Sequence, residues 1–145
     1  MAINKPVYDP KGLTQIHLFL FFAQVLLIGI GIYVISKGTS EFFWILDQWI
    51  YWSIPVLIVA MDSLGQWSFN HQFSALATEE DIEEKFLKLV RGHLIQYALV
   101  EGATFLAIVI GIVEDNYFFI FLAMFNTLYF YSLKPRIYTY NHDPV

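Results

Sequence analysis

Four apolar segments dominate this sequence and limit what it can fold into. They cover approximately residues 13–36, 42–64, 92–113 and 117–133. A helix needs about 20 predominantly apolar residues to cross the hydrocarbon core of a bilayer, and each segment is of that order. Only 14% of the residues are charged, against roughly 25% in an ordinary soluble domain. The sequence therefore predicts an all-α integral membrane protein that forms one transmembrane domain over residues 1–145, and not a soluble enzyme or a nucleic-acid binder.

The lengths of the connections predict how the four helices follow one another. The connections at residues 37–41 and 114–116 are short, so we expect two antiparallel hairpins within a four-helix bundle. The middle connection, residues 65–91, is longer. In it Thr78 precedes a run of acids, which is typical of a helix start with an N-cap residue. We therefore expect the third helix to begin near Thr78 in water and to enter the bilayer near Arg91.

The basic residues predict the orientation. Seven of the eight lysines and arginines lie on one side of the predicted spans, and Lys37 alone lies on the other. The seven are Lys5, Lys11, Lys85, Lys88, Arg91, Lys134 and Arg136. Cytoplasmic loops of membrane proteins carry the excess of such residues. The sequence therefore predicts a multi-pass protein of a bacterial inner membrane whose N- and C-termini are both cytoplasmic.

Each predicted span carries at least one polar side chain close to mid-bilayer depth. Glu101 is an acid near the middle of the third span, where a charged residue costs about 2.5–3.5 kcal/mol on insertion scales. Gln24, Ser53 and Asn126 lie at similar depth in the other spans, and Thr104 lies one turn beyond Glu101. We expect Glu101 to face the interior and to contact Gln24, Asn126 or Thr104. This layer is either a proton or ion site built on Glu101 or a set of hydrogen bonds that fixes the helix register.

A second polar stripe lies at the predicted cytoplasmic end of the second span. Asp62, Gln66 and Asn70 are spaced by four residues and therefore share one helix face. Arg91 is expected at a similar depth on the third helix, so that an ion pair between Asp62 and Arg91 is one interpretation. A cytoplasmic vestibule leading toward Glu101 is the other.

No pattern of catalytic or metal-binding residues is visible in the chain. It has no cysteine, so disulfides, thiolate metal sites and thiol catalysis are not available. His17 and His93 lie at matched depth on two predicted spans, and a bis-histidine haem is the alternative that this spacing raises. We expect no cofactor and no bound metal, and the sequence favours a protein that is not an enzyme.

One stretch resembles a known group of proteins. Residues 91–109, RGHLIQYALVEGATFLAIV, resemble a pattern of small four-helix bacterial membrane proteins that are uncharacterised. The basic, proline-containing segment 133–136 also resembles the ending of that group. The Ala-Leu-Val-Glu core at residues 98–101 is similar to one helix of the proteolipid subunit of rotary ATPases, whose carboxylate binds an ion. That similarity implies an ion-binding carboxylate at Glu101, whereas the glycine-rich repeat of a proteolipid's partner helix is absent here.

Three classes of function follow from these observations. The first is a membrane protein that handles protons or cations through Glu101. The second is a non-catalytic scaffold or accessory subunit of a membrane complex, in which the polar layer holds the helices together. The third is a lipid-binding membrane protein or a membrane enzyme with a pocket near Pro55 and Glu101. In all three the partners are the lipid bilayer and either further copies of the chain or other subunits, and nucleic acid is not among them.

Overall fold

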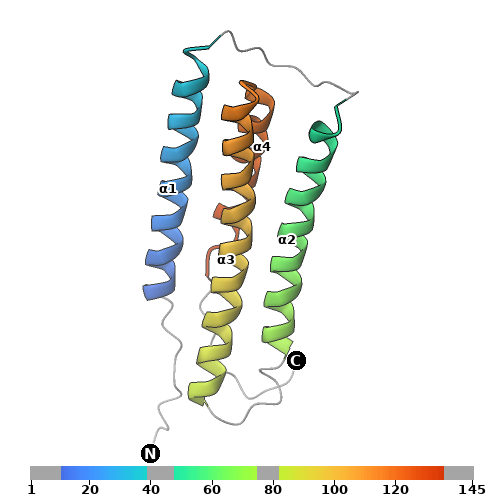
Figure 1. The fold of residues 1–145 in the computed structure, drawn as a ribbon. Coiled ribbons are helices and arrows are strands. Elements are labelled where there is room, and N and C mark those ends of the chain that lie inside the picture. Colours follow the sequence, from blue (N-terminus) through green and yellow to red (C-terminus); the bar gives the residue numbers. More distant parts are fainter. Residues whose placement is uncertain (1–10, 39–47, 75–81, 136–145) are drawn as a thin grey trace, which may run out of the picture.

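Four α-helices make up the regular structure of the part of the chain that can be described. The computed structural model describes residues 11–38, 48–74 and 82–135. The helices are α1 (Lys11–Ile35), α2 (Ile50–Ser74), α3 (Ile82–Val113) and α4 (Tyr117–Ser132). They run alternately up and down (Figure 1). The prediction of an all-α chain with four helices is confirmed for these residues.

The order of the helices in space differs from the prediction of two hairpins. The strongest packing joins α3 to α2 and to α4, and α1 packs on both α3 and α4. α1 and α2 therefore lie on opposite sides of the α3–α4 pair (Figure 1). The expected hairpin of the first two helices is wrong, because α3 inserts between them. The hairpin of α3 and α4 is present.

The helix boundaries follow the apolar segments with two differences. α2 begins at Ile50, well after the predicted start at residue 42, and it continues to Ser74. Residues 42–47 lie outside the described part of the chain. α3 is one continuous helix of 32 residues from Ile82, so the predicted extension of this helix ahead of residue 92 is confirmed from Ile82 onward. Its predicted cap at Thr78 lies outside the described residues.

A tight turn joins α3 to α4, and Asn116 is its key residue. The Asn116 side chain accepts a hydrogen bond of 2.9 Å from the Phe118 amide and so caps α4. Its Nδ2 atom donates a hydrogen bond of 2.7 Å to the Tyr51 hydroxyl of α2. We call this end of the bundle the turn end, and the opposite end, at Lys11 and Leu133, the tail end. The turn end is closed by direct contacts between α2 and the start of α4.

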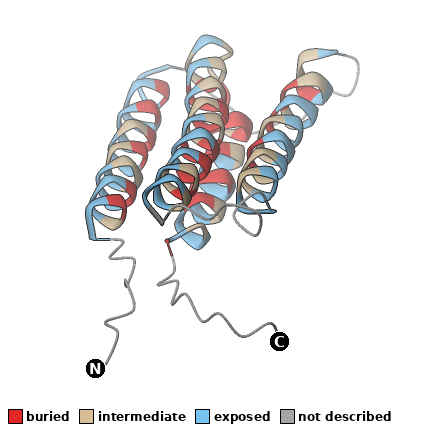
Figure 2. Cartoon of the chain, turned by 90° about the horizontal axis from the view of Figure 1, so that it is seen from below, coloured by how far each residue is buried: buried red, intermediate tan, exposed pale blue. Residues whose placement is uncertain are grey.

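The outer surface of the bundle is apolar, and the interior holds several polar side chains within a hydrophobic core. The buried polar residues are His17, Gln24, His93, Gln96, Thr104, Asn116, Asn126 and Thr127. Large apolar side chains cover the outer faces of all four helices, among them Phe19, Phe22, Leu26, Val56, Leu87, Phe105, Phe125 and Leu128. The buried positions face the centre of the bundle when it is viewed along its axis (Figure 2). Exposed apolar patches of this extent are rare on soluble monomers.

Two of the helices are long and apolar enough to cross a membrane. They are the described segments Lys11–Ile35 and Glu83–Val113. α4 is apolar but has only 16 residues. α2 is not among the candidates over its described residues, and it carries the polar stripe that includes Asp62.

Candidate functional site

A polar cluster lies in the middle of the bundle, where α1, α3 and α4 meet. Asn126 Nδ2 donates to Thr104 Oγ1 and to the Val100 carbonyl oxygen, both at 3.1 Å. The Thr104 hydroxyl lies 3.1 Å from that same carbonyl and 3.5 Å from Gln24 Oε1. All three polar side chains are buried. The sequence predicted similar depths for Gln24 and Asn126 and placed Thr104 one turn beyond Glu101, and these three side chains lie together.

The acid beside this cluster is Asp62 of α2. The side chains of Asp62 and Asn126 are close enough to interact. One carboxyl oxygen of Asp62, Oδ1, is buried and has no hydrogen-bond partner among the described residues. Gln24 Nε2 is likewise buried without a partner. We call Gln24, Asp62, Thr104 and Asn126 the central polar cluster, which brings together one side chain from each helix.

The depth of Asp62 differs from the sequence-based expectation because of where α2 begins. The apolar segment starting at residue 42 placed Asp62 at the cytoplasmic end of the span. With α2 starting at Ile50, Asp62 is 12 positions into its helix, or about 18 Å at 1.5 Å per residue. Asn126 is 9 positions into α4, which starts at the same end as α2 and runs in the same direction. The two side chains therefore meet near the middle of the bundle.

Glu101 does not take the place predicted for it. The hydrogen bonds donated by Asn126 and Thr104 go to Val100 and Gln24, and none reaches Glu101. Val100 and Thr104 are four residues apart and share the inward face of α3. Glu101 is the next residue after Val100 and is rotated by about 100° from it. Its side chain is consequently only half-buried, at the edge of that face.

A chain of side-chain amides runs from the central polar cluster toward the tail end. Gln96 Nε2 donates to Gln66 Oε1 at 2.9 Å, and Gln66 Nε2 donates to Asn70 Oδ1 at 3.0 Å. Gln66 and Asn70 are thus neighbours, as their four-residue spacing predicted. They are joined to α3 by Gln96, which the sequence reasoning did not single out. In both hydrogen bonds the donor lies nearer to α3 and the acceptor lies nearer to the tail end of α2.

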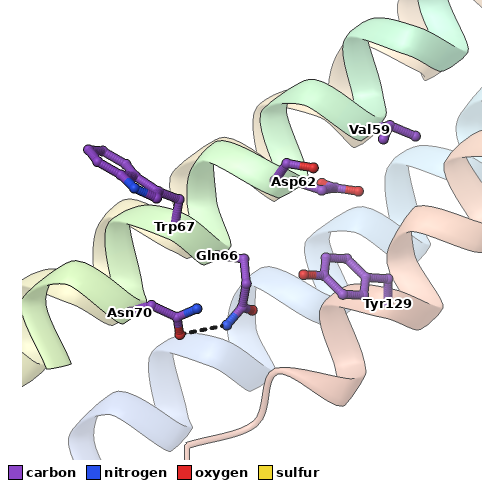
Figure 3. Close-up of a pocket in the computed structure, with 7 residues that line it drawn as sticks. Val59, Asp62, Gln66, Trp67, Asn70 and Tyr129 are labelled. Carbon is purple, nitrogen blue, oxygen red and sulfur yellow. Dashed lines mark hydrogen bonds between the residues drawn. The ribbon is translucent and has the colours of Figure 1, made fainter. Parts of the chain in front are cut away.

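An open pocket of about 520 Å³ lies between α2 and α4 beside these groups. It is lined by Val59, Asp62, Ser63, Gln66, Trp67, Asn70 and Tyr129. Asp62 and Gln66 extend from α2 and Tyr129 extends from α4 into the space between the helices, whereas Trp67 points away from α4 (Figure 3). Tyr129 was also missed by the sequence reasoning. Its position three residues after Asn126, on the same helix face, is the signal that would have found it.

Arg91 and Ser53 lie away from the central polar cluster. Arg91 is exposed and makes no ion pair with Asp62. Its neighbour Gly92 packs against Phe69 and Gln72, which are seven and ten residues beyond Asp62 and so about 10–15 Å along the α2 axis. Ser53 bonds the Ile50 carbonyl of its own helix at 3.4 Å. The predicted pairing of Asp62 with Arg91 is therefore wrong.

The two buried histidines form an aromatic cluster at the tail end. His17 Nε2 lies 2.8 Å from the Phe130 carbonyl oxygen, and the His17 ring stacks on Phe130 at 4.7 Å between centroids. Both imidazoles also contact the ring of Tyr97, with centroids 5.2 Å away for His17 and 5.6 Å for His93. A haem ligand must aim its ring nitrogen into an open space as wide as the macrocycle. These packed rings do not fit the bis-histidine haem alternative.

The described residues contain no group of three or more His, Cys, Asp or Glu side chains that could hold a metal ion. What the central polar cluster offers instead is one carboxyl group with an unfilled acceptor position, next to amides and a hydroxyl. Such a group can take up a proton or pair with a cation. Comparison of the chain with protein-family models, with curated proteins and with solved structures finds no match.

Proposed function

We propose that this chain is a multi-pass integral protein of a bacterial inner membrane, with four spans and both termini in the cytoplasm. The observation that supports this most is the apolar outer surface of all four helices, on which many large hydrophobic side chains are exposed while several amides, imidazoles and hydroxyls are buried in the interior. Lipid is the medium in which such an outer surface is stable. The seven-to-one excess of lysine and arginine on the tail-end side supports the orientation.

Within that membrane, the proposed function is the handling of protons or cations at the central polar cluster, with Asp62 as the ionisable group. The supporting observation is the buried Oδ1 atom of Asp62, which no described side chain neutralises or bonds. Ionisable groups inside a membrane are costly, and they mark ion pathways and proton relays when they face the bundle interior. Asn126 and Thr104 position the site, since their hydrogen bonds lock the adjoining faces of α3 and α4.

The role first assigned to Glu101 is transferred to Asp62 in this proposal. Both are acids in apolar helices. Only Asp62 combines a buried, unpartnered oxygen with a neighbouring amide from another helix. The pocket between α2 and α4 also reaches Asp62 and not Glu101, and its lining continues along α2 as far as Asn70, toward the tail end.

Flux measurements with two matched variants test the proposal. The full chain is reconstituted in liposomes containing a pH-sensitive dye, and proton flux is followed under an imposed potential. The same liposomes are then tested with sodium and potassium gradients. Asp62→Asn keeps the size and polarity of the side chain but removes its ionisation, and we expect the flux to fall at least tenfold. Glu101→Gln, the matched control, should leave it within about twofold.

The contrary outcome supports a different class of function. If wild type carries no flux of any of these ions, the site is not an ion pathway, and the role of the cluster is to join the helices. The hydrogen bonds from Asn126 to α3, and from Thr104 toward α1, favour this second candidate, a scaffold or accessory subunit of a membrane complex. The outward-facing aromatic pair Phe121 and Phe125 on α4 provides a surface for a second copy or another subunit. Crosslinking through a cysteine at position 125 then reveals the partner.

A further inference from the structure

The pocket between α2 and α4 is much larger than a proton or a bare metal ion needs. Its volume of about 520 Å³ falls within the range of about 300–1,000 Å³ that is typical of small-molecule sites. It exists because α2 packs along α3 but scarcely on α4. Contact between α2 and α4 occurs at the turn end, where Tyr51 meets Phe118 and Phe119 with ring centroids 5.8 and 5.0 Å apart. Beyond that contact the two helices leave a space whose lining begins at Val59, one turn before Asp62.

The polar lining of the pocket is matched to a positively charged donor. Asp62 is the one charged residue among the seven that line it, and none of them is basic. The amides of Gln66 are already occupied, because its oxygen accepts from Gln96 and its nitrogen donates to Asn70. The Oδ1 atom of Asp62 is buried without a hydrogen-bond partner, so the described side chains leave the hydrogen-bonding capacity of this carboxyl group partly unused. A ligand that approaches the carboxyl group from the pocket must bring a hydrogen-bond donor, and a positive charge gives the strongest such bond to a carboxylate.

The remaining walls suit the carbon skeleton of such a ligand. Val59 is apolar, and Tyr129 faces Asp62 from α4 (Figure 3). An aromatic ring attracts a cation placed within about 6 Å of its face. The pocket is also open at its side, so a molecule larger than its volume can leave a tail outside.

We propose that this pocket binds the ammonium group of an organic amine, with Asp62 as the anionic partner and Tyr129 as the facing wall. This rests on the proposed function, since it names a substrate class for the same carboxyl group. The ammonium group belongs either to the headgroup of a lipid such as phosphatidylethanolamine or to a small water-soluble amine. In both cases it enters between α2 and α4.

Two arms of one binding experiment distinguish these sources. The full chain is placed in nanodiscs of phosphatidylglycerol, which carries no ammonium group. In the first arm 2-phenylethylammonium is titrated by calorimetry, with 2-phenylethanol as the uncharged control of similar shape. In the second arm phosphatidylethanolamine is mixed into the lipid, and native mass spectrometry counts the lipids retained. We expect wild type to bind in at least one arm, and 2-phenylethanol to bind at least tenfold more weakly than the amine.

Variants locate the binding in the pocket. Asp62→Asn should weaken ammonium binding at least tenfold, and Asp62→Glu, which keeps the charge, should retain most of it. Glu101→Gln serves as the control outside the pocket and should bind as wild type does. Circular dichroism of each variant establishes that it is folded, and Asp62→Glu supports the assignment if Asp62→Asn fails to fold. Binding that is equal in wild type and Asp62→Asn, or absent from both arms, overturns the proposal.

The outcome is separable from that of the proposed function. If Asp62→Asn abolishes proton or metal-cation flux while neither arm shows ammonium binding, the inference about amines fails and the ion site stands. If ammonium binds at Asp62 and no inorganic ion or proton is carried, the amine pocket stands and the ion site fails.

Discussion

The two ends of the interface between α2 and its neighbours differ in a way that bears on function. At the turn end Tyr51 is fully buried, its hydroxyl accepts a hydrogen bond from Asn116, and its ring packs on Phe118 and Phe119. Beyond Asp62, by contrast, a pocket separates α2 from α4 and a carboxyl oxygen has no partner. The first region has the packing and hydrogen-bond satisfaction of a structural core. The second has an open space and a carboxyl oxygen without a hydrogen-bond partner, which are features of a ligand site.

This difference predicts opposite responses to removing a polar group. In the closed region the side chains of Asn116 and Tyr51 are hydrogen-bonded, so deletion of one leaves the other buried and unsatisfied. In the open region the carboxyl group of Asp62 has an unpartnered oxygen, so deletion relieves a burial cost. Three substitutions test this contrast, and a fourth tests the packing of α1. Unfolding in mixed micelles by a denaturing detergent measures each of them.

The largest effect is expected for Asn116→Ala. It removes the cap of α4, worth about 1 kcal/mol, and leaves the Tyr51 hydroxyl buried without its partner, which costs about 1–3 kcal/mol. We expect the free energy of unfolding to fall by about 2–4 kcal/mol. Asn116→Asp is the control, because its carboxylate can both cap α4 and accept from Tyr51, and it should lose less than half as much. A loss below about 0.5 kcal/mol for Asn116→Ala would show that the turn end is not a structural core.

Gly31→Leu should have the next largest effect. A Cβ atom at Gly31 would lie 3.0 Å from Ile120 Cδ1 and 3.4 Å from Ile108 Cγ2, so a larger side chain forces α1 away from α3 and α4. Overpacking of this kind costs about 1–3 kcal/mol. Gly29, two residues earlier on the same helix, has no atom within 4 Å of such a Cβ. Gly29→Leu should therefore be neutral or stabilising, and equal losses for the two variants would contradict the packing described for α1.

The depth of several polar residues along their helices could be predicted from the sequence. Gln24 and Asn126 were assigned to one level by counting from the ends of their apolar segments, with Thr104 one turn beyond Glu101, and these three are hydrogen-bonded or close to one another. Ser53 was assigned to the same level and lies away from them. The same counting failed for Asp62, because hydropathy gave the wrong start for α2. Helix ends are set by capping and by neighbouring segments, which an apolar run does not report.

The rotation of each helix about its axis, and the order in which the helices pack, could not be predicted from the sequence. Glu101 and Thr104 both lie on α3, yet only Thr104 faces the cluster, because the inward direction depends on which helices pack around α3. In an apolar helix with similar residues on every side, hydropathy does not indicate which helix packs against which face. The insertion of α3 between α1 and α2 was missed for the same reason. The depth of a polar residue was therefore predictable on α1, α3 and α4 and not on α2, whereas the partner of a polar residue was not predictable.

Asn126→Ala should have an intermediate effect, because the central polar cluster lies between the two regions. Hydrogen bonds between membrane helices average about 0.6 kcal/mol and reach about 1.7 kcal/mol. The substitution removes the bonds from α4 to Thr104 and Val100, and we expect a loss within that range. A loss above about 3 kcal/mol would assign the cluster to the structural core and would favour the scaffold function.

The smallest effect, and one of opposite sign, is expected for Asp62→Leu. Removing a buried oxygen that has no partner relieves desolvation, so stability should stay unchanged or rise by up to about 1 kcal/mol. Ion flux and ammonium binding should nevertheless be lost in the same preparation. A marked loss of stability, comparable to that of Asn116→Ala, would mean that Asp62 is a structural group.

The most direct measurement is the reaction of Ser63→Cys with a water-soluble, membrane-impermeant thiol reagent. The chain has no native cysteine, and Ser63 lines the pocket next to Asp62 without belonging to the central polar cluster. Because such reagents react with a thiol that water reaches, Ser63→Cys should be labelled from the cytoplasmic side alone, and an organic amine should slow its labelling. Val56→Cys, on the outward apolar face of α2, should stay unlabelled from both sides. Labelling of Ser63→Cys from the outside, or of both positions at equal rates, would contradict a membrane-embedded pocket that opens toward the cytoplasm.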